Sequence, residues 1–257
     1  HYMDDSREGG ICAPPMRAVA LTWPLSSRFD SYWGDSSFPV EVQQHQVHYN
    51  ESISWTRPMR PDEQLNIPGE FVSMRSHPAG TLITLRYEAK DQREALVFTE
   101  HIVGLFRGVT LTDDGAESAP QPVIADASAD AEEAWSTSIP IDPLAAHVYD
   151  GCTDIIFPIH TSVSFARQVG LTDPIYQGTA TLGLAVREIL NREGGGDPAI
   201  LAAVHCGFRG MVFPGTTITL RVHEIKEGEE ERVVCFDVLD EECALALRGG
   251  RVHLKKN

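Results

Sequence analysis

The sequence predicts an α+β protein, with antiparallel strands in both halves of the chain and one long helix in the second half. Three observations predict this class. Several segments of both halves alternate apolar and polar residues, which is the period of a half-buried strand. Residues 178–191 instead repeat apolar residues at the helical period. Residues 112–138, rich in Asp, Glu, Ala, Ser and Pro, separate the two halves as a solvated connector.

Strand-like segments dominate the first half. Gln46–Trp55 partly alternates apolar and polar side chains. Residues 82–87 (LITLRY) and 95–109 (ALVFTEHIVGLFRGV) are rich in β-branched and aromatic residues, which favour strands. The tripeptide 78–80 (PAG) predicts a turn before the first of these two segments. We therefore expect the first half to be mostly β.

The second half begins with helical signals. Thr161 or Ser162 is expected to cap a short helix that runs to Gln168. Residues 178–191 (GTATLGLAVREILN) predict a longer helix, because their apolar side chains fall on one face. The glycine run 194–196 ends this helix, since glycine adopts left-handed conformations without penalty.

Strand signals follow the long helix. Residues 201–208 and 216–226 alternate, and a turn rich in Glu leads into residues 233–239. A last pair of strands is expected within residues 243–254, about the glycines at 249–250. A long apolar helix followed by antiparallel strands predicts a sheet wrapped around that helix.

The charge balance excludes two classes of protein. The chain has 257 residues, with 21 Lys and Arg against 37 Asp and Glu, so its formal net charge is −16. Sequence-independent binding of nucleic acid rests on clustered Lys and Arg, so we expect no nucleic-acid partner. A membrane-spanning helix needs about 20 consecutive apolar residues, and no run approaches this length, so we expect no membrane span.

The cysteines argue against a disulfide framework and against a zinc site. The chain has 5 of them, an odd number at wide spacings, and no two form a CxxC pair. Reduced thiols are the expectation, and they are typical of an intracellular protein. We expect a cytoplasmic location, with a peroxisomal one left open, and no metal.

Residues 149–178 hold the side chains from which we expect chemistry. His160 follows the rigid Pro158 and stands immediately before the predicted short helix. Asp154 lies upstream of it, and a carboxylate and a His so close in sequence can form an acid–base pair if the chain folds back between them.

The start of the long helix offers a second part of a site. The free N–H groups of a first helical turn, with the helix dipole, can bind an oxygen that gains negative charge. Gly178 would let a ligand approach these groups closely, although a glycine also suits close packing of the helix. Gln177 either faces a substrate or hydrogen-bonds the neighbouring loop.

These residues resemble the MaoC-like dehydratase and (R)-specific enoyl-CoA hydratase family of the hot-dog fold. The family pattern is an aromatic residue, two further residues, Ser-Gly-Asp-x-Asn-Pro-Ile-His, then His-Gly at the start of a central helix and a later Pro-Gly turn. Tyr149, residues 158–160 (PIH), Gly178 and residues 212–216 (VFPGT) match this pattern. The first half of the chain resembles the family less closely.

The resemblance implies a double hot-dog protein, with two curved antiparallel sheets and the second wrapped around the long central helix. Residues 1–111 would form an N-terminal degenerate hot-dog unit, residues 112–138 the acidic linker, and residues 139–257 a C-terminal hot-dog unit with the catalytic motif. In such chains the first unit helps to shape the acyl pocket.

Two positions depart from the family pattern. Counted back from His160, the position of the family's catalytic Asp is Ile155, whereas counted forward from Tyr149 it is Asp154. The family's His of His-Gly is Gln177 here. Either a local bulge aims Asp154 at His160, or His160 works with another partner, for which Asp150 is a weaker candidate.

The resemblance implies a hydro-lyase that adds water to an enoyl thioester or removes it from a 3-hydroxyacyl thioester, with no cofactor. In dehydration, His160 would remove the α-proton and Asp154 would help the 3-hydroxyl leave as water. The N–H groups of Gly178 and Thr179 would stabilise the thioester oxygen, and Gln177 and Tyr149 would help to bind the substrate. Coenzyme A or an acyl carrier protein would carry the acyl group, and the resemblance allows a homodimer.

The change at Ile155 keeps two other interpretations open. One is an isomerase, cyclase or thioesterase on the same scaffold in a secondary-metabolite pathway. Isomerisation needs only the movement of a proton, so it would lose little without the second acid. The other is a non-catalytic acyl-binding partner, because a fold does not determine a function.

Overall fold

The computed structural model describes residues 1–6, 9–28, 31, 41–42, 46–122 and 133–256. The chain divides into two compact units, His1–Val123 and Ile124–Asn257, and each is described by itself.

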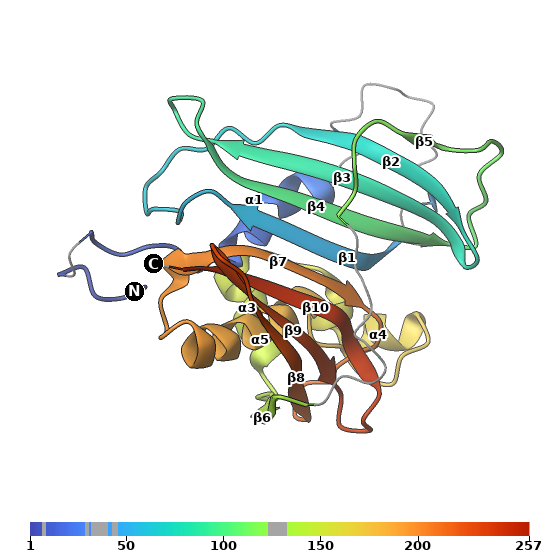
Figure 1. Ribbon diagram of the computed structural model, residues 1–257. Coiled ribbons are helices and arrows are strands. Elements are labelled where there is room, and N and C mark those ends of the chain that lie inside the picture. The colour runs from blue at the N-terminus through green and yellow to red at the C-terminus, as the bar shows by residue number, and fades with distance from the viewer. Residues whose placement is uncertain (7–8, 29–30, 32–40, 43–45, 123–132, 257) are drawn as a thin grey trace. The chain divides into compact units, whose positions relative to one another are not determined.

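The first unit is an antiparallel sheet with helix α1 (Arg17–Ser26) packed against one of its strands, β4 (Figure 1). Its strands lie in the order β5-β2-β3-β4-β1. Their bounds are β1 (Gln46–Trp55), β2 (Gly69–His77), β3 (Gly80–Lys90), β4 (Leu96–Arg107) and β5 (Ala116–Glu117).

The predicted strands of the first half are confirmed at β1, β3 and β4. β2 has no counterpart among the predictions, because its sequence (GEFVSMRSH) mixes charged and apolar residues without a regular alternation. It pairs with β3 nonetheless, through a register that shifts between Phe71 and Ser73. Pairing with a neighbouring strand therefore decides its structure, rather than local propensity.

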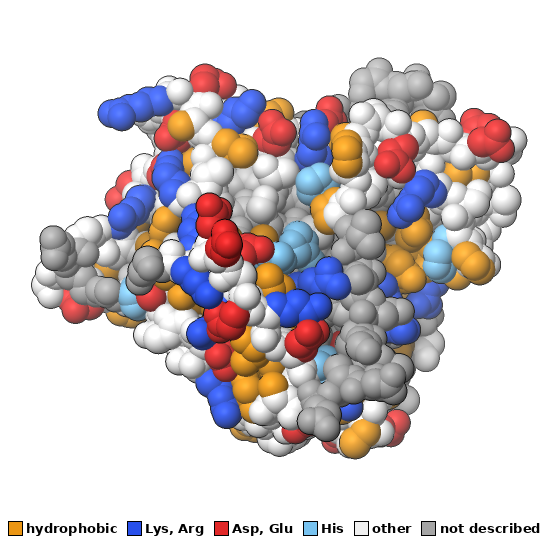
Figure 2. Space-filling model, viewed as in Figure 1, with side chains coloured by type: hydrophobic (Ala, Val, Ile, Leu, Met, Phe, Trp, Pro, Cys, Tyr) orange, Lys and Arg blue, Asp and Glu red, His pale blue; other side chains and the backbone are white. Residues whose placement is uncertain are grey.

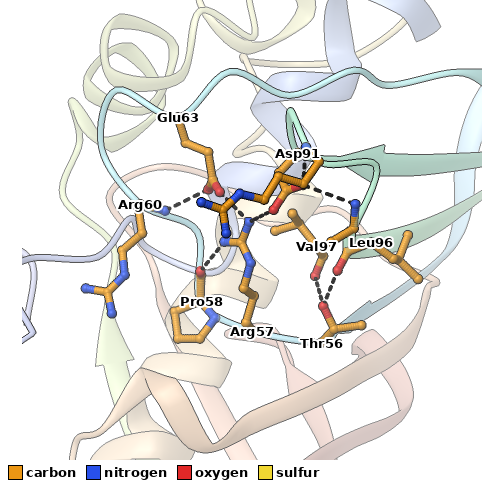
Figure 3. Close-up of polar contacts among 10 residues, drawn as sticks. Thr56, Arg57, Pro58, Arg60, Glu63, Asp91, Leu96 and Val97 are labelled. Carbon is orange, nitrogen blue, oxygen red and sulfur yellow. Dashed lines mark hydrogen bonds and ion pairs between the residues drawn. The ribbon is translucent and has the colours of Figure 1, made fainter.

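A charged cluster joins the segment after β1 to the turn between β3 and β4 (Figure 3). Arg57 donates to the carboxylates of Glu63 and Asp91, the latter at 3.0 Å. Asp91 also accepts the backbone N–H groups of Arg93 and Ala95, which shapes the turn. We therefore assign Arg57 a structural role in the first unit.

The second unit combines another antiparallel sheet with three α-helices among its described residues. Its strands lie in the order β7-β10-β9-β8-β6. Their bounds are β6 (Trp135–Pro140), β7 (Leu201–Phe208), β8 (Thr217–Glu227), β9 (Glu231–Leu239) and β10 (Leu245–Lys255). The helices are α3 (Ala145–Thr153), α4 (Val163–Gln168) and α5 (Gly178–Glu193), with short 3₁₀ turns η2 (Pro158–His160) and η3 (Pro198–Ile200).

The predicted long helix is α5, and it packs along the sheet against β7 and β10 (Figure 1). Its apolar face is buried as the periodicity predicts, through Leu182, Ala185, Val186, Ile189 and Leu190. Burying a large apolar side chain contributes about 1.5–3 kcal/mol, so this face provides much of the core of the unit.

The last predicted pair of strands is wrong, because β10 is one continuous strand. Gly249 has a φ of 64°, and the pairing of β10 with β9 shifts register between Leu247 and Gly250. The two glycines therefore accommodate an irregularity within the strand instead of a turn.

The predicted linker 112–138 includes residues of both units. Its described part contains β5, which pairs with β2, and the beginning of β6. Residues 123–132 of it lie outside the described residues.

Charges of both signs lie interspersed on the face drawn in Figure 2. Among the ion pairs of the second unit, Arg232 binds Glu227 and Glu193, and Lys256 binds Glu227 at 2.8 Å. In the described part of the chain, no helix is both long and apolar enough to cross a membrane.

Candidate active site

The 3₁₀ turn η2 and the capped helix α4 position His160. Pro158 begins η2, and the Oγ of Ser162 caps α4 by accepting the N–H of Phe165 at 3.2 Å. His160 Nδ1 lies 2.9 Å from the carbonyl oxygen of Ile175, and the N–H of Ile175 donates to the carbonyl of Ile159. These contacts hold the imidazole beside the segment that leads into α5.

The carbonyl of Ile175 fixes the tautomer of His160. A carbonyl oxygen only accepts, so Nδ1 carries the proton and Nε2 is the basic nitrogen of the neutral ring. Burial lowers the pKa of His160 below its ordinary value, while the hydrogen bond with Ile175 raises it. Near neutral pH the ring is therefore uncharged and able to accept a proton at Nε2.

Two side-chain contacts join α3 to the first turn of α5. The hydroxyl of Tyr149 lies 3.0 Å from Thr179 Oγ1. The amide of Gln177 donates to Asp150 Oδ1 at 2.5 Å and to the carbonyl of Ala146 at 3.1 Å. The structure thus brings together four predicted residues, Tyr149, Asp150, Gln177 and Thr179.

Gln177 is almost fully buried, with 2% exposure, and its side chain bonds the neighbouring helix. Its Oε1 atom is buried and has no hydrogen-bond partner among the described residues. Burial raises the pKa of Asp150, and the hydrogen bond from Gln177 lowers it. This buried Asp–Gln contact depends on α3, which the sequence did not predict, because AAHVYDGCT contains a glycine and β-branched residues.

Asp154 stands at the C-terminal end of α3 with a φ of 59°, and its side chain is exposed. Ile155, in the other position that the family pattern indicates for the acid, is buried. Asp154 thus ends α3 in the left-handed conformation, which Asp tolerates better than most residues.

The close packing of α5 against β7 requires a glycine at position 178. A Cβ atom added to it would lie 2.8 Å from Cδ1 of Phe208, a distance that real Cβ atoms essentially never show. Phe208 ends β7, so the glycine lets α5 begin close to the sheet. The packing interpretation of Gly178 thus has a direct observation in its favour, and a role in ligand approach stays a prediction.

The segment that leads into α5 contacts two other segments that match the family pattern. Ile175 bonds Ile159 beside His160, and one residue later the N–H of Tyr176 donates to the carbonyl of Val212 at 2.7 Å. The second contact is an isolated antiparallel bridge. The segment before α5 therefore joins the turn with His160 to the strand-like residues near Val212.

The family model of the MaoC like domain matches residues 127–243. The second unit belongs to the MaoC-like dehydratase family. The match spans α3, η2, α4 and α5 and most of the sheet of that unit.

Two curated proteins are similar over most of the chain. The peroxisomal multifunctional enzyme type 2 of Drosophila melanogaster is 28% identical over 193 residues, which are 74% of this chain and 31% of that protein. The enoyl-CoA hydratase ChsH3 of Mycobacterium tuberculosis is 24% identical over 187 residues, which are 72% of this chain and 64% of that protein. The chain thus covers less than two thirds of the length of either protein.

A solved structure agrees with the fold of both units. The crystal structure of a MaoC-like dehydratase from Phytophthora capsici matches with a TM-score of 0.81 at 22% identity, covering 98% of this chain and 86% of that one. The chain therefore has an α+β fold of the hot-dog type. Within the residues that the structure describes, no group of three His, Cys, Asp or Glu side chains is arranged to hold a metal ion.

Proposed function

We propose that the chain is a hydro-lyase that adds water to enoyl thioesters or removes it from 3-hydroxyacyl thioesters. One observation carries the proposal: in a unit of the MaoC-like family, His160 is held through Nδ1 beside the start of α5, so that Nε2 is its basic nitrogen. The name of one relative, an enoyl-CoA hydratase, supports an acyl-CoA substrate. An acyl carrier protein is the alternative carrier.

The proposed architecture is a double hot-dog. Each unit would be one hot-dog, and the sheet of the second would wrap around α5, which already packs against β7 and β10. The first unit would help to shape the acyl pocket. The side chains of Ile156, Phe157 and Met211 are exposed near the segments that converge on His160, and such apolar side chains suit an acyl chain.

The proposed dehydration consists of proton transfers. His160 Nε2 takes the α-proton of a 3-hydroxyacyl thioester, and the N–H groups of Gly178 and Thr179 bind the oxygen that gains negative charge. The carbon–oxygen bond at C3 then breaks as a carboxylic acid gives its proton to the departing hydroxyl, which leaves as water. Hydration runs through the same steps in reverse.

Asp154 is the proposed acid, because its exposed side chain is accessible to a substrate. Asp150 is the competing candidate, and it is buried against Gln177. The two are separated by assaying Asp154→Asn and Asp150→Asn. If Asp154 is the acid, Asp154→Asn loses about 10²–10⁴-fold in hydration rate, and Asp150→Asn loses less.

The hydro-lyase proposal is tested by assaying crotonyl and longer enoyl thioesters with the unaltered protein. Hydration of at least one chain length is the expected result. Failure with every chain length, combined with turnover of another thioester, would overturn the proposal.

A specific observation favours a second candidate, a double-bond isomerase. Ile155 occupies one of the two possible positions of the family's Asp and is buried, so the site has an apolar side chain where an acid is expected. Isomerisation moves one proton from carbon to carbon and needs no acid for a departing hydroxyl. Migration of the double bond in a 3-enoyl thioester without release or uptake of water would favour this candidate.

A further inference from the structure

Two glutamates of the first unit are buried side by side beneath α1. Glu51 belongs to β1 and Glu100 to β4, and both are 0% exposed. Neither belongs to the proposed active site. Full burial of two acids in one place is costly unless each charge is compensated or removed.

The pairing of β1 with β4 places the two side chains on one face. Glu51 lies opposite Ile102, and Glu100 lies opposite Ile53, so the glutamates are diagonal neighbours on adjacent strands. The two carboxyl groups are near enough to affect each other's ionisation, because the charge of Glu51 raises the pKa of Glu100. Two carboxylates cannot donate to one another, so a hydrogen bond between these groups requires a proton on one of them.

The neighbouring groups do not neutralise the pair. His48 Nε2 lies 3.1 Å from Glu51, but burial lowers the pKa of His48 to about 4, so the ring is uncharged at neutral pH. Tyr87 on β3 also faces the pair, with its hydroxyl 3.0 Å from Ser26 of α1, and burial raises its pKa to about 12. From α1 itself, the buried hydroxyl of Thr22 faces Glu100.

The carboxyl oxygens lack an ordinary donor. Among the described residues, the four buried oxygens of Glu51 and Glu100 accept no hydrogen bond of ordinary geometry, although His48 Nε2 lies 3.1 Å from Glu51 Oε2. Burial raises the pKa of Glu51 to about 8 and that of Glu100 well above its ordinary value, where the charge of Glu51 raises it further. A proton between the two groups supplies the missing donor and removes one charge.

We propose that Glu51 and Glu100 hold a shared proton beneath α1, and that loss of this proton at alkaline pH releases α1 from the sheet of the first unit. The pair then acts as a pH-sensitive latch. When α1 is detached, both carboxyl groups reach water and ionise freely. The apolar face around Ile53 and Ile102 becomes accessible at the same time.

The direction of the pH effect follows from linkage. The attached state binds more protons than the detached state from the ordinary carboxyl pKa of 4.5 up to about 8, so attachment weakens as the pH rises through this range. His48 opposes this effect only below its ordinary pKa of 6.5, because above that value it is neutral in both states. The window between pH 6.5 and 8 therefore reports on the two glutamates.

The test is hydrogen exchange of the full chain, resolved by peptide and expressed as protection factors to remove the intrinsic effect of pH. We expect the protection of α1 to fall about tenfold per pH unit for each proton lost between pH 6.5 and 8. Peptides of α5 serve as the internal reference. The double variant Glu51→Gln/Glu100→Gln removes both titrating groups and should keep the protection of α1 constant, whereas Glu117→Gln on the exposed β5 should behave as the unaltered protein.

Two results would overturn the latch: constant protection of α1 in the unaltered protein, or the same fall in the double variant. If the double variant does not fold, infrared spectroscopy of the unaltered protein decides the question. The carbonyl band of a protonated carboxylic acid should be present at pH 6.5 and lost together with the protection of α1. Its absence at pH 6.5 would contradict the shared proton.

Discussion

One hydrogen bond fixes the tautomer of His160. The carbonyl of Ile175 accepts from Nδ1 and leaves Nε2 as the base, which is the arrangement that removal of an α-proton requires. The family pattern predicted this residue from the sequence. It could not predict the hydrogen bond, because the partner is a backbone group fifteen residues later and leaves no mark in residue type.

The pKa of His160 leads to a first prediction. Because burial lowers this pKa, the neutral, base-competent ring persists below the ordinary value of 6.5. We expect the acidic limb of the profile of kcat/KM against pH to have its midpoint below 6.5. A midpoint clearly above 6.5 would show that another group limits the reaction or that the ring is not buried.

Gln177 leads to a second prediction at this scale. Its amide gives the buried Asp150 a hydrogen bond, so Gln177→Leu leaves that carboxyl without its donor. We expect a loss of about 1–3 kcal/mol in the free energy of unfolding, measured by urea titration. Gln92→Leu, at an exposed residue of the first unit that bonds Gln64, is the matched control and should change stability little. Equal effects of the two substitutions would argue against a buried Asp–Gln contact.

Among the elements, β1, β7 and α5 follow from local sequence, whereas β2 and α3 do not. The alternation in β1 and β7 and the helical period of α5 repeat over enough residues to predict these elements. α3 is short and contains a glycine, so contacts such as that of Gln177 with Asp150 stabilise it instead of propensity. Because α3 carries Tyr149, Asp150 and the turn at Asp154, the carboxylate side of the site could not be predicted in detail.

The close approach of α5 to β7 is tested by Gly178→Ala. The added Cβ meets the ring of Phe208, and overpacking of this kind costs about 1–3 kcal/mol. The companion substitution Phe208→Leu should recover much of this loss in thermal or urea unfolding. Full stability of Gly178→Ala alone would contradict the packing.

The same pair of variants separates the two roles of Gly178. If the glycine serves packing alone, the stable double variant regains hydration activity. If it also admits the substrate to the N–H groups of Gly178 and Thr179, the double variant stays impaired although it is folded.

At the scale of the whole molecule, the composition of the sequence and the structure both divide the chain into two units. The acidic stretch 112–138 separates the two predicted halves, and the chain divides into compact units at Val123 and Ile124. The sequence could not predict that β5 and the beginning of β6 lie within this stretch, because two-residue pairings such as that of β5 have no periodic pattern.

Limited proteolysis tests this organisation. A protease that cleaves after Glu should cut first after Glu133, an exposed residue just before β6, and leave two resistant fragments. Mass spectrometry of the early products gives the site of the cut. First cuts inside the sheet of either unit would contradict the division.

We infer that His160 is the base of a thioester hydro-lyase, and the decisive measurement is the hydration of crotonyl-CoA and its longer analogues by His160→Ala. His253→Ala is the matched control, because His253 is also half-buried in the second unit but binds Glu231 on the sheet. We expect His160→Ala to lower the hydration rate by about 10²–10⁴-fold, while His253→Ala retains the activity of the unaltered protein. Hydration at an unaltered rate in folded His160→Ala would contradict it.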